Sequence, residues 1–239
     1  MVILGIDTST DILDLAIIRN GSLIAGYTIH QKDITHSALI IPALKNTLDI
    51  VKLDLKNIEG IAVAIGPGSF TGLRIGLATA LGLCFSLKIP IVGVNTLDAY
   101  ALQWKEFPGL LCPLIKARKD EYYFALFRKD RAEEKAQHHL AKIEDYQCCP
   151  WINIQEKLLK YGEHVYMFGY GLEDIVVDEK NETIRNHIHF VDRGQNPPGA
   201  VPIASLGERK ILNGRPDDMF TLSPFYLHRS AAELKKRSR

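Results

Sequence analysis

The chain has 239 residues, of which 46% are hydrophobic and 24% are charged. This composition is typical of a globular protein with enough apolar material for one large core or two ordinary ones, and it excludes collagenous, mucin-like and disordered chains. The 29 basic and 28 acidic residues give a formal net charge of +1, so net charge favours no particular class of partner.

The first hundred residues predict an alternation of strands and helices. Two apolar runs, VILGID and LDLAIIRN, predict strands, and Asn20-Gly21 predicts a hairpin turn into a third strand, SLIAGYTIH. Helical spacing with Thr35 as N-cap follows over residues 35–53. A strand at 58–66, a long apolar helix ending at residue 87, a strand at 89–96 and a helix at 97–104 complete the series. This order predicts an α/β layer with antiparallel strands first and parallel strands later.

The second half carries weaker signals. The stretch EFPGLLCP predicts a hinge, which divides the chain into domains 1–105 and 106–239. Residues 114–130 predict a hairpin with Lys119-Asp120 at the turn, VYMFGYG a strand and turn, and AVPIASLGERKIL a helix. No internal repeat is visible. The basic tail (Lys235, Lys236, Arg237 and Arg239) fits either a solvated terminus or a segment that adds affinity for RNA phosphates.

The cysteines and the first residues of the chain indicate the cellular compartment in which we expect the protein. None of the four cysteines forms a Cys-x-x-Cys pair, and the neighbours Cys148 and Cys149 have poor geometry for a disulfide. MVILGIDTST lacks the features of a signal peptide, so we expect a reducing, cytoplasmic location. The most apolar run, residues 75–87, is too short to span a bilayer, so we expect a buried helix and no membrane.

The turn Gly66-Pro67-Gly68-Ser69 raises the question of phosphate binding. A Walker-type loop requires a second glycine followed by lysine, and neither register supplies them. The dinucleotide pattern Gly-x-Gly-x-x-Gly is a closer match, but Thr71 stands where the third glycine belongs. A Rossmann-type dinucleotide enzyme therefore remains a minor alternative, and Ser69 is interpreted as the start of a helix. GPGSFTG is also not the Gly-x-Ser-x-Gly of a serine nucleophile.

The helix that follows has an unusual surface. Gly72, Gly76 and Ala80 recur every four residues and form a small-residue stripe, beside a ridge of leucines. Glycine costs about 1 kcal/mol relative to alanine in a helix, so we expect a packing reason: the close approach of another helix. The helix at 35–53 is also apolar around most of its surface. These two helices predict a surface covered by another subunit or by the second domain. Arg74, the one charged residue of its helix, has no role at this level.

Several of these segments resemble one family. ILGIDTST, the His36-x5-Pro42 spacing, GPGSFTGLRIG, GLCFSLKIPIVGVNTLDA and KARKDEYYFALF together resemble the TsaB (YeaZ) family of tRNA threonylcarbamoyladenosine biosynthesis proteins. The resemblance spans roughly residues 3–127; beyond residue 130 it rests on FGYG and SPFYLHR. It implies a two-lobed actin/Hsp70-like fold with ribonuclease-H-like sheets and a reduced second lobe.

The resemblance also implies a function in a complex. TsaB proteins pair with a TsaD-like catalytic subunit through helices of the first lobe, and the assembly transfers threonylcarbamoyl to N6 of the adenosine beside the anticodon. This chain would then be a non-catalytic subunit, with a TsaE-like ATPase as a further partner, tRNA bound through the complex, and a homodimer formed when it is alone. The residues expected at the partner interface are Leu39, Ala43, Gly72, Leu73, Gly76, Leu77 and Ala80. Gly76→Leu is expected to block pairing while leaving the monomer folded.

Catalytic residues are not expected. In ATPases of this fold, Asp7, Thr8, Ser9 and Thr10 would hold phosphate and metal, so they mark a possible vestigial nucleotide site. The second lobe has Lys116 where the family usually has aspartate, and lysine cannot coordinate magnesium. We therefore expect ATP and Mg²⁺ only in the assembled complex. His36 has no second histidine one turn later, which favours a hydrogen bond at the helix start over a metal site. A stand-alone ATPase or kinase remains the alternative, and the other histidines lack evident metal-ligand partners.

Overall fold

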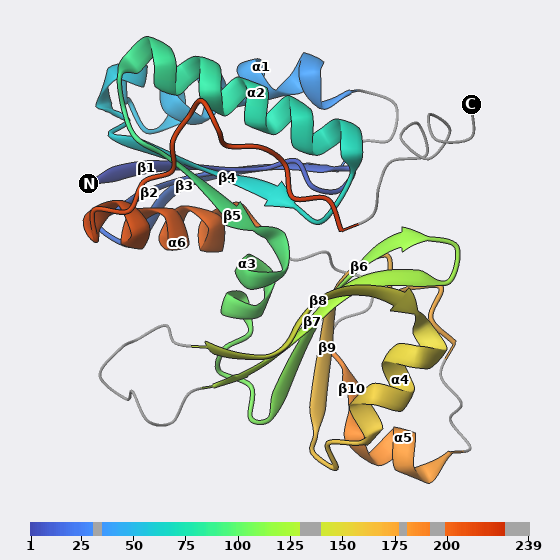
Figure 1. Cartoon of the computed structure of the whole chain (residues 1–239). Coiled ribbons are helices and arrows are strands. Elements are labelled where there is room, and N and C mark those ends of the chain that lie inside the picture. Colours follow the sequence, from blue (N-terminus) through green and yellow to red (C-terminus); the bar gives the residue numbers. More distant parts are fainter. Residues whose placement is uncertain (31–34, 130–139, 177–180, 192–198, 228–239) are drawn as a thin grey trace. The chain divides into compact units, whose positions relative to one another are not determined.

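The computed structural model describes residues 1–30, 35–129, 140–176, 181–191 and 199–227 (Figure 1). They form two compact units, Met1–Ala99 with Pro198–Tyr226, and Tyr100–Pro197 with Leu227–Arg239. The first boundary lies close to the expected one at residue 105. The expectation that 106–239 forms a single lobe is wrong, because the helix predicted at 200–212 packs on the first sheet. The basic tail at 235–239 lies outside the described residues.

The first unit contains a five-stranded sheet in the order β3-β2-β1-β4-β5. Its strands are β1 (Val2–Asp7), β2 (Ile12–Arg19), β3 (Ser22–His30), β4 (Gly60–Gly66) and β5 (Ile91–Asn95). β1 pairs antiparallel with β2 and β2 with β3, and the turn between β2 and β3 is Asn20-Gly21, where both residues have positive φ. β4 and β5 run parallel to β1. The predicted layer is confirmed, and the antiparallel strands β2 and β3 on one side of β1 distinguish this sheet from the all-parallel dinucleotide-binding sheet.

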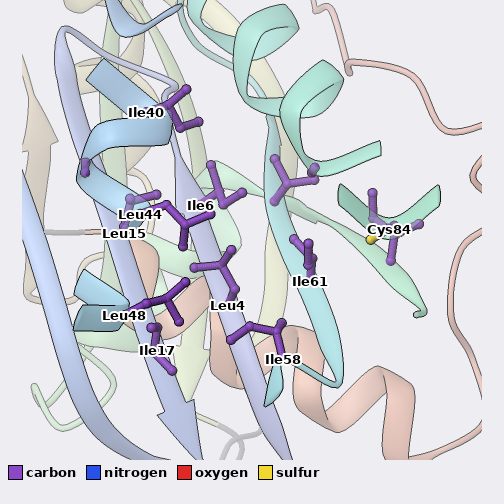
Figure 2. Packing of buried hydrophobic residues seen from close by; sticks show 14 of the residues in the cluster. Leu4, Ile6, Leu15, Ile17, Ile40, Leu44, Leu48, Ile58, Ile61 and Cys84 are labelled. Atoms are coloured by element: carbon purple, nitrogen blue, oxygen red, sulfur yellow. The ribbon is translucent and has the colours of Figure 1, made fainter. Parts of the chain in front are cut away.

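Helices cover both faces of this sheet (Figure 1). α1 (His36–Ile50) and α2 (Phe70–Leu87) pack on one face, and α6 (Ala200–Leu212) packs on the other. Figure 2 shows the core beneath α1, where Leu4 and Ile6 of β1 meet Ile40, Leu44 and Leu48. Alternate side chains of β1 point to opposite faces, so this strand supplies both cores. Each fully buried side chain of this size contributes about 1.5–3 kcal/mol.

The starts of α1 and α2 follow the sequence signals. Thr35 is the N-cap of α1, although its side chain makes no capping hydrogen bond. Ser69 is the N-cap of α2, and its hydroxyl accepts a hydrogen bond of 3.2 Å from the backbone N–H of Gly72. Ser69 therefore starts the helix, as predicted.

By length and composition, α2 is long and apolar enough to cross a membrane. It is one continuous helix of 18 residues, longer than the run at 75–87 that the sequence singled out. The same test is passed by core helices of soluble proteins, and the inner side of α2 packs on β4, β1 and β5.

The second unit contains a sheet in the order β10-β9-β6-β7-β8. Its strands are β6 (Leu110–Arg118), β7 (Glu121–Lys129), β8 (Leu140–Pro150), β9 (Val165–Tyr170) and β10 (Ile188–Phe190), with α4 (Trp151–Leu159) and α5 (Glu182–His187). The hairpin at Lys119-Asp120 is confirmed, with Asp120 at φ +59°. The predicted hinge ends earlier than expected, because Leu110 already begins β6.

The two sheets share one topology. In each, three antiparallel strands are followed by two that run parallel to the first, giving the same spatial order. The sequence shows no repeat, so the repetition lies in the arrangement of the strands. This agrees with the expected pair of ribonuclease-H-like sheets, and the second unit retains all five strands.

The chain finally returns to the first unit. α3 (Thr96–Gln103) contains the division between the units, and α6 follows the second sheet. After α6, Asp217 bonds to the outer edge of β5 at two points: its N–H donates to Ile91 O (2.9 Å) and its carboxylate accepts from Gly93 N–H (2.8 Å). Phe225 N–H then donates to Ile65 O (2.7 Å). This C-terminal segment covers the edge of the sheet, where unpaired backbone groups would otherwise be exposed.

Candidate functional site

The Asp7–Thr10 loop joins β1 to β2, and none of its four residues is more than 7% exposed. Asp7 Oδ1 accepts a hydrogen bond from the backbone N–H of Ser9 (2.9 Å). Thr10 Oγ1 accepts one from the N–H of Ile12 (3.2 Å). Short polar side chains that bond to the backbone two residues on stabilise a turn. The carboxylate and one hydroxyl of the loop are therefore engaged in shaping it.

The same loop binds the first turn of α2. Thr8 Oγ1 donates a hydrogen bond of 2.8 Å to the carbonyl oxygen of Gly72, and the N–H of Ser69 donates one of 2.6 Å to Ser9 O. The second bond satisfies a backbone donor that a helix start leaves without an intrahelical partner. The loop and the helix start thus form one buried hydrogen-bonded unit.

His36 ties the loop to α1. Its Nε2 lies 2.9 Å from the carbonyl oxygen of Thr10, a distance at which a protonated Nε2 donates a hydrogen bond. This contact confirms the predicted hydrogen-bonding role of His36 at the helix start. The Asp7–Thr10 loop therefore anchors the N-terminal ends of both helices on this face of the sheet.

Two buried carboxyl groups face each other across β1 and β2, at Asp7 and Asp14. Burial raises the pKa of Asp7, against the opposing effect of its hydrogen bond from Ser9. Burial raises the pKa of Asp14 to about 6, although hydrogen bonds from Thr28 Oγ1 (2.6 Å) and Ala200 N–H (2.7 Å) lower it. The Asp14 carboxylate lies at the N-terminus of α6, where negative charge is favourable. Asp14 thereby fastens α6 to the sheet.

These contacts test whether the loop can hold a nucleotide phosphate. A Cβ on Gly68 would lie 2.3 Å from Ser9 O, and one on Gly72 would lie 2.0 Å from Thr8 O. The space between the loop and α2 therefore has no room for a phosphate. The Ser9 hydroxyl is buried and makes no hydrogen bond to any described residue, but it lies within this packed contact. The contact between the loop and α2 therefore leaves no place for a phosphate and its metal on that side of the loop.

Lys116 lies near the end of β6, at the position where the resemblance implies an acidic metal ligand. Its Nζ donates to the carboxylate of Asp174, and this hydrogen bond raises the pKa of the lysine. Gly171 packs closely against the lysine stem, since a Cβ there would lie 2.5 Å from the Lys116 Cβ. Lys116 is thus an ion-pair partner of Asp174 in the second unit.

The small-residue stripe of α2 faces inward, so its predicted role is wrong. A Cβ on Gly76 would lie 2.2 Å from Thr8 Oγ1, and the carbonyl oxygen of Thr8 faces Gly72. The glycines admit the Asp7–Thr10 loop, and the nearest atoms to both of them among the described residues belong to Thr8 and Ser69. Leu39 is half-buried, and the other residues expected at the interface are buried: Ala43, Gly72, Leu73, Gly76, Leu77 and Ala80. A partner cannot contact these six side chains while the unit is folded.

A different set of α2 residues faces outward. These residues are spaced three or four apart and form one stripe along the helix. We call this stripe the outer stripe, and its residues are Thr71, Arg74, Ala78, Gly82 and Phe85. Phe85 is 71% exposed, and a Cβ on Gly82 would meet no atom within 4 Å. On α1, Ile41 and Ile50 are 53% and 72% exposed. The exposed side of α2 is therefore small and apolar between Arg74 and Phe85, and α1 adds Ile41 and Ile50 beside the exposed polar residues Lys45, Asn46 and Asp49.

A pocket of about 270 Å³ opens beside this face. It lies among α1, the segment around the short 3-10 helix Leu55–Asn57, and α2. Six apolar residues line it: Ile41, Leu44, Leu48, Leu53, Leu55 and Leu83. Three charged residues complete the lining: Lys45, Asp49 and Asp54. The pocket extends the apolar face of α1 and α2.

Arg74, which had no role at the level of sequence, is held by two aromatic rings. Its guanidinium carbon lies 3.7 Å from the centroid of the Phe70 ring, and its Nε donates a hydrogen bond of 2.9 Å to Tyr226 Oη. The Phe70 and Tyr226 rings are 5.1 Å apart. Tyr226 belongs to the SPFYLHR motif, but its contact with a residue 152 positions earlier is not visible in the sequence.

Histidines of the second unit form a small surface group. His164 Nδ1 lies 2.8 Å from His189 Nε2, and His187 Nδ1 lies 2.9 Å from the carbonyl oxygen of Thr183. Burial and the neighbouring imidazoles lower the pKa of His189. Within the described ranges, no three histidine, cysteine or acidic residues are arranged to hold a metal ion. His138 and His139 lie outside the described residues.

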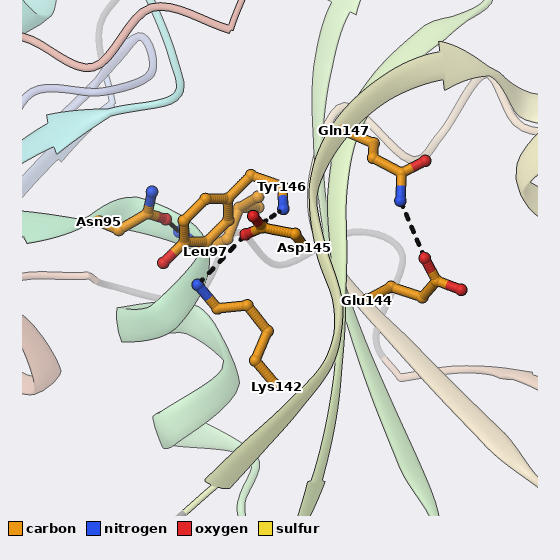
Figure 3. Close-up of polar contacts among 7 residues, drawn as sticks. All are labelled: Asn95, Leu97, Lys142, Glu144, Asp145, Tyr146 and Gln147. Atoms are coloured by element: carbon orange, nitrogen blue, oxygen red, sulfur yellow. Dashed lines mark hydrogen bonds and ion pairs between the residues drawn. The ribbon is translucent and has the colours of Figure 1, made fainter.

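The polar residues of β8 form local contacts (Figure 3). Lys142 Nζ lies 3.6 Å from Asp145 Oδ1 and 3.3 Å from the centroid of the Tyr146 ring, while Gln147 donates a hydrogen bond of 3.0 Å to Glu144. Exposed ion pairs of this kind contribute about 0–1 kcal/mol. These contacts fix side chains on the surface of the strand, and they do not converge on a common point where a substrate atom could react.

Comparisons with known proteins agree with this geometry. Residues 25–235 match the family model described as TsaD: tRNA N6-adenosine threonylcarbamoyltransferase. The chain is 30% identical over 237 residues to the tRNA threonylcarbamoyladenosine biosynthesis protein TsaB of Bacillus subtilis, covering 98% of this chain and 97% of the relative. It is also 33% identical over 115 residues to a tRNA N6-adenosine threonylcarbamoyltransferase of Syntrophus aciditrophicus, covering 42% of this chain and 34% of that enzyme.

The fold has a solved counterpart. YeaZ from Pseudomonas aeruginosa superposes with a TM-score of 0.71 at 21% identity, covering 95% of this chain and 99% of that one. This likeness supports the two-lobed actin-like fold that the sequence predicted. Because the B. subtilis relative is matched over nearly its full length, the chain belongs to the TsaB (YeaZ) family of tRNA threonylcarbamoyladenosine biosynthesis proteins.

Proposed function

We propose that this chain is a non-catalytic subunit that binds and stabilises a TsaD-like catalytic subunit. The assembly transfers a threonylcarbamoyl group from its adenylate to N6 of the adenosine beside the anticodon, in tRNAs that read codons beginning with A. Two findings support the proposal: membership of the TsaB family, and a match to the family model named for the transferase itself.

The observation that carries the proposal is the exposed apolar face of α1 and α2. Phe85 is 71% exposed and Ile50 is 72% exposed, with Ile41 on the same side of α1 as the pocket. Large apolar side chains that gather on one face mark a site of protein association. Ala78 and Gly82 of the outer stripe leave room for a partner helix to approach closely.

The Asp7–Thr10 loop supports the non-catalytic part of the proposal. Its Thr8 hydroxyl and its backbone hold the starts of α1 and α2, so the conformation of this face depends on the loop. In the proposal, ATP and Mg²⁺ bind only in the assembled complex, a TsaE-like ATPase joins it, and tRNA binds through it. The chain acts in the cytoplasm and, when alone, pairs with a second copy through the same face.

The test mixes the chain with a TsaD-like subunit and measures the mass of the complex by light scattering and its affinity by titration calorimetry. Phe85→Asp is expected to weaken binding at least tenfold, because it places a charge in the apolar contact. Val176→Asp, at an apolar residue of the second unit that is 83% exposed, is the matched control and should bind normally. Normal binding by Phe85→Asp would refute the assignment of this face.

The ATPase alternative has its own measurement. Calorimetry of the chain alone with Mg-ATP should detect no tight binding, because the Asp7–Thr10 loop is buried and packed against the start of α2. Tight binding, with turnover abolished by Asp7→Ala, would favour a stand-alone ATPase or kinase.

A further inference from the structure

The guanidinium of Arg74 is fixed in place on the outer stripe. It lies 3.7 Å from the centroid of the Phe70 ring, and only its Nε is used, in the hydrogen bond to Tyr226 Oη. Among the described residues, none forms an ion pair with Arg74. Among the described residues its two terminal nitrogens have no hydrogen-bond partner, and they carry four N–H groups in the plane of the guanidinium. This is the preorganised fork with which arginine binds a carboxylate or a phosphate.

Arg74 lies close to the N-terminal end of α2. It is the fifth residue of α2, and no acidic residue lies in the first turn. The N-terminal end of a helix carries partial positive charge, so a cation there is disfavoured and an anion is favoured. The arginine and the helix end together create a local excess of positive charge that the described part of this unit does not neutralise. An anion from outside the chain would neutralise this positive charge.

The surroundings favour a protein carboxylate over an RNA phosphate. Arg74 is the only charged residue between Phe70 and Leu87, and the next residues of the outer stripe are Ala78, Gly82 and Phe85. Phosphate-binding surfaces use several lysines and arginines, because each neutralised phosphate adds affinity. A single arginine beside a smooth apolar helix face is instead typical of an anchor at a protein interface.

We propose that Arg74 is the residue that recognises an acidic side chain on the TsaD-like partner. An aspartate or glutamate on a partner helix packed along the outer stripe accepts hydrogen bonds from both terminal nitrogens of the guanidinium. Phe70 and Tyr226 hold the guanidinium in the orientation that this pairing requires. The inference rests on the proposed function, and it adds the chemistry by which the partner is chosen.

The spacing of the outer stripe gives the partner helix a pattern. Arg74 and Phe85 are separated by eleven residues, or about 16 Å along a helix axis. Between them Ala78 and Gly82 present almost no side chain, which allows a helix axis to approach to about 8 Å. The partner helix therefore carries an acidic residue at one end of the contact, small residues in its middle, and an apolar group against Phe85 at the other end.

The experiment measures the affinity of the full chain for a TsaD-like subunit at low and high salt. Arg74→Ala is expected to weaken binding ten- to a hundredfold and to reduce its dependence on salt, because it removes the charge pair. Arg74→Lys should lie between, since an ammonium cannot form the two-pronged contact. Tyr226→Phe keeps the ring and removes the hydroxyl that orients the arginine, so it should weaken binding several-fold. Arg19→Ala, which removes an exposed arginine from β2, is the matched control.

The outcomes separate this inference from the proposed function. If the wild-type chain does not bind the subunit, the proposed function fails. If the wild type binds and Arg74→Ala binds equally well, with an unchanged melting temperature, the acid-recognition role is overturned while the proposed function stands. If Arg74→Ala keeps its partner but the assembled complex loses affinity for tRNA, the arginine contacts RNA, and the inference is also overturned.

Discussion

The hydroxyl of Thr8 donates a hydrogen bond of 2.8 Å to the carbonyl oxygen of Gly72, and this contact decides which side of α2 is available to a partner. The Asp7–Thr10 loop fits against Gly72 and Gly76 so closely that a methyl group at either position would overlap it. The glycine side of α2 is therefore internal, and the outer stripe is the side that another protein can reach.

Glycine substitutions in α2 should have opposite effects on its two sides. Gly76→Ala is expected to lower the free energy of unfolding by about 1–3 kcal/mol, because its Cβ would lie 2.2 Å from Thr8 Oγ1. Gly82→Ala, on the open side, should raise it by up to about 1 kcal/mol through helix propensity. Urea unfolding followed by circular dichroism measures both. Equal effects would contradict the assignment of the two sides.

The earlier expectation for Gly76→Leu changes accordingly. A leucine there would displace the loop that anchors both helices, so the variant should lose folded monomer as well as partner binding. A cooperative melting transition at the wild-type temperature would argue against the packing described here.

Asp14 should make stability depend on pH. Its pKa in the folded protein is about 6, above the usual 3.8, so the folded state holds the proton more tightly than the unfolded chain. The stabilisation that this proton provides is complete below pH 3.8 and is lost as pH rises through 6. A shift of about two units corresponds to about 3 kcal/mol. Asp14→Asn should remove this loss, and urea unfolding at several values between pH 4 and 7 measures the difference.

The matched control for Asp14 is Asp49→Asn, at an exposed carboxyl of α1. It should leave the pH dependence of unfolding unchanged. If Asp14→Asn and wild type lose stability in parallel between pH 4 and 7, the buried Asp14 carboxyl does not control this transition.

The chain alone should form a dimer that depends on the exposed face of α1 and α2. Sedimentation equilibrium is expected to show dimers for the wild type and for Val176→Asp. Ile50→Asp and Phe85→Asp should shift the equilibrium toward monomer, since each places a charge on an apolar residue that is more than 70% exposed. Dimers that persist in both variants would indicate a different interface.

The thiols should react in an order set by burial. Burial raises the pKa of Cys84 to about 12 and also raises that of Cys112, so neither forms a thiolate at pH 8. Burial likewise raises the pKa of Cys148 to about 12. Iodoacetamide labelling of the native protein should therefore leave Cys84 and Cys112 unmodified, while labelling in urea modifies all four cysteines. Peptide mass spectrometry reads the sites, and rapid native labelling of Cys84 would contradict this order.

Local signals predicted much of the first unit. The hairpin at Asn20-Gly21, the N-cap Ser69 and the helix at 200–212 each depend on residues that are near in sequence, so their patterns are reliable there. The second half was predicted less completely. β8, with its mixed polar and apolar pattern, and the short elements α5 and β10 have no strong period, because each is only half-buried or very short.

The sequence by itself determined the family, the alternating strands and helices, and an apolar α2 with one arginine. Only the tertiary structure decided that Gly72 and Gly76 face the Asp7–Thr10 loop and that Asp14 holds α6, 186 residues away. Periodicity distinguishes the two sides of a helix only when their composition differs, and both sides of α2 are apolar. Which side is buried therefore depends on contacts between distant segments, and those contacts leave the outer stripe, with Arg74, on the exposed side of the helix.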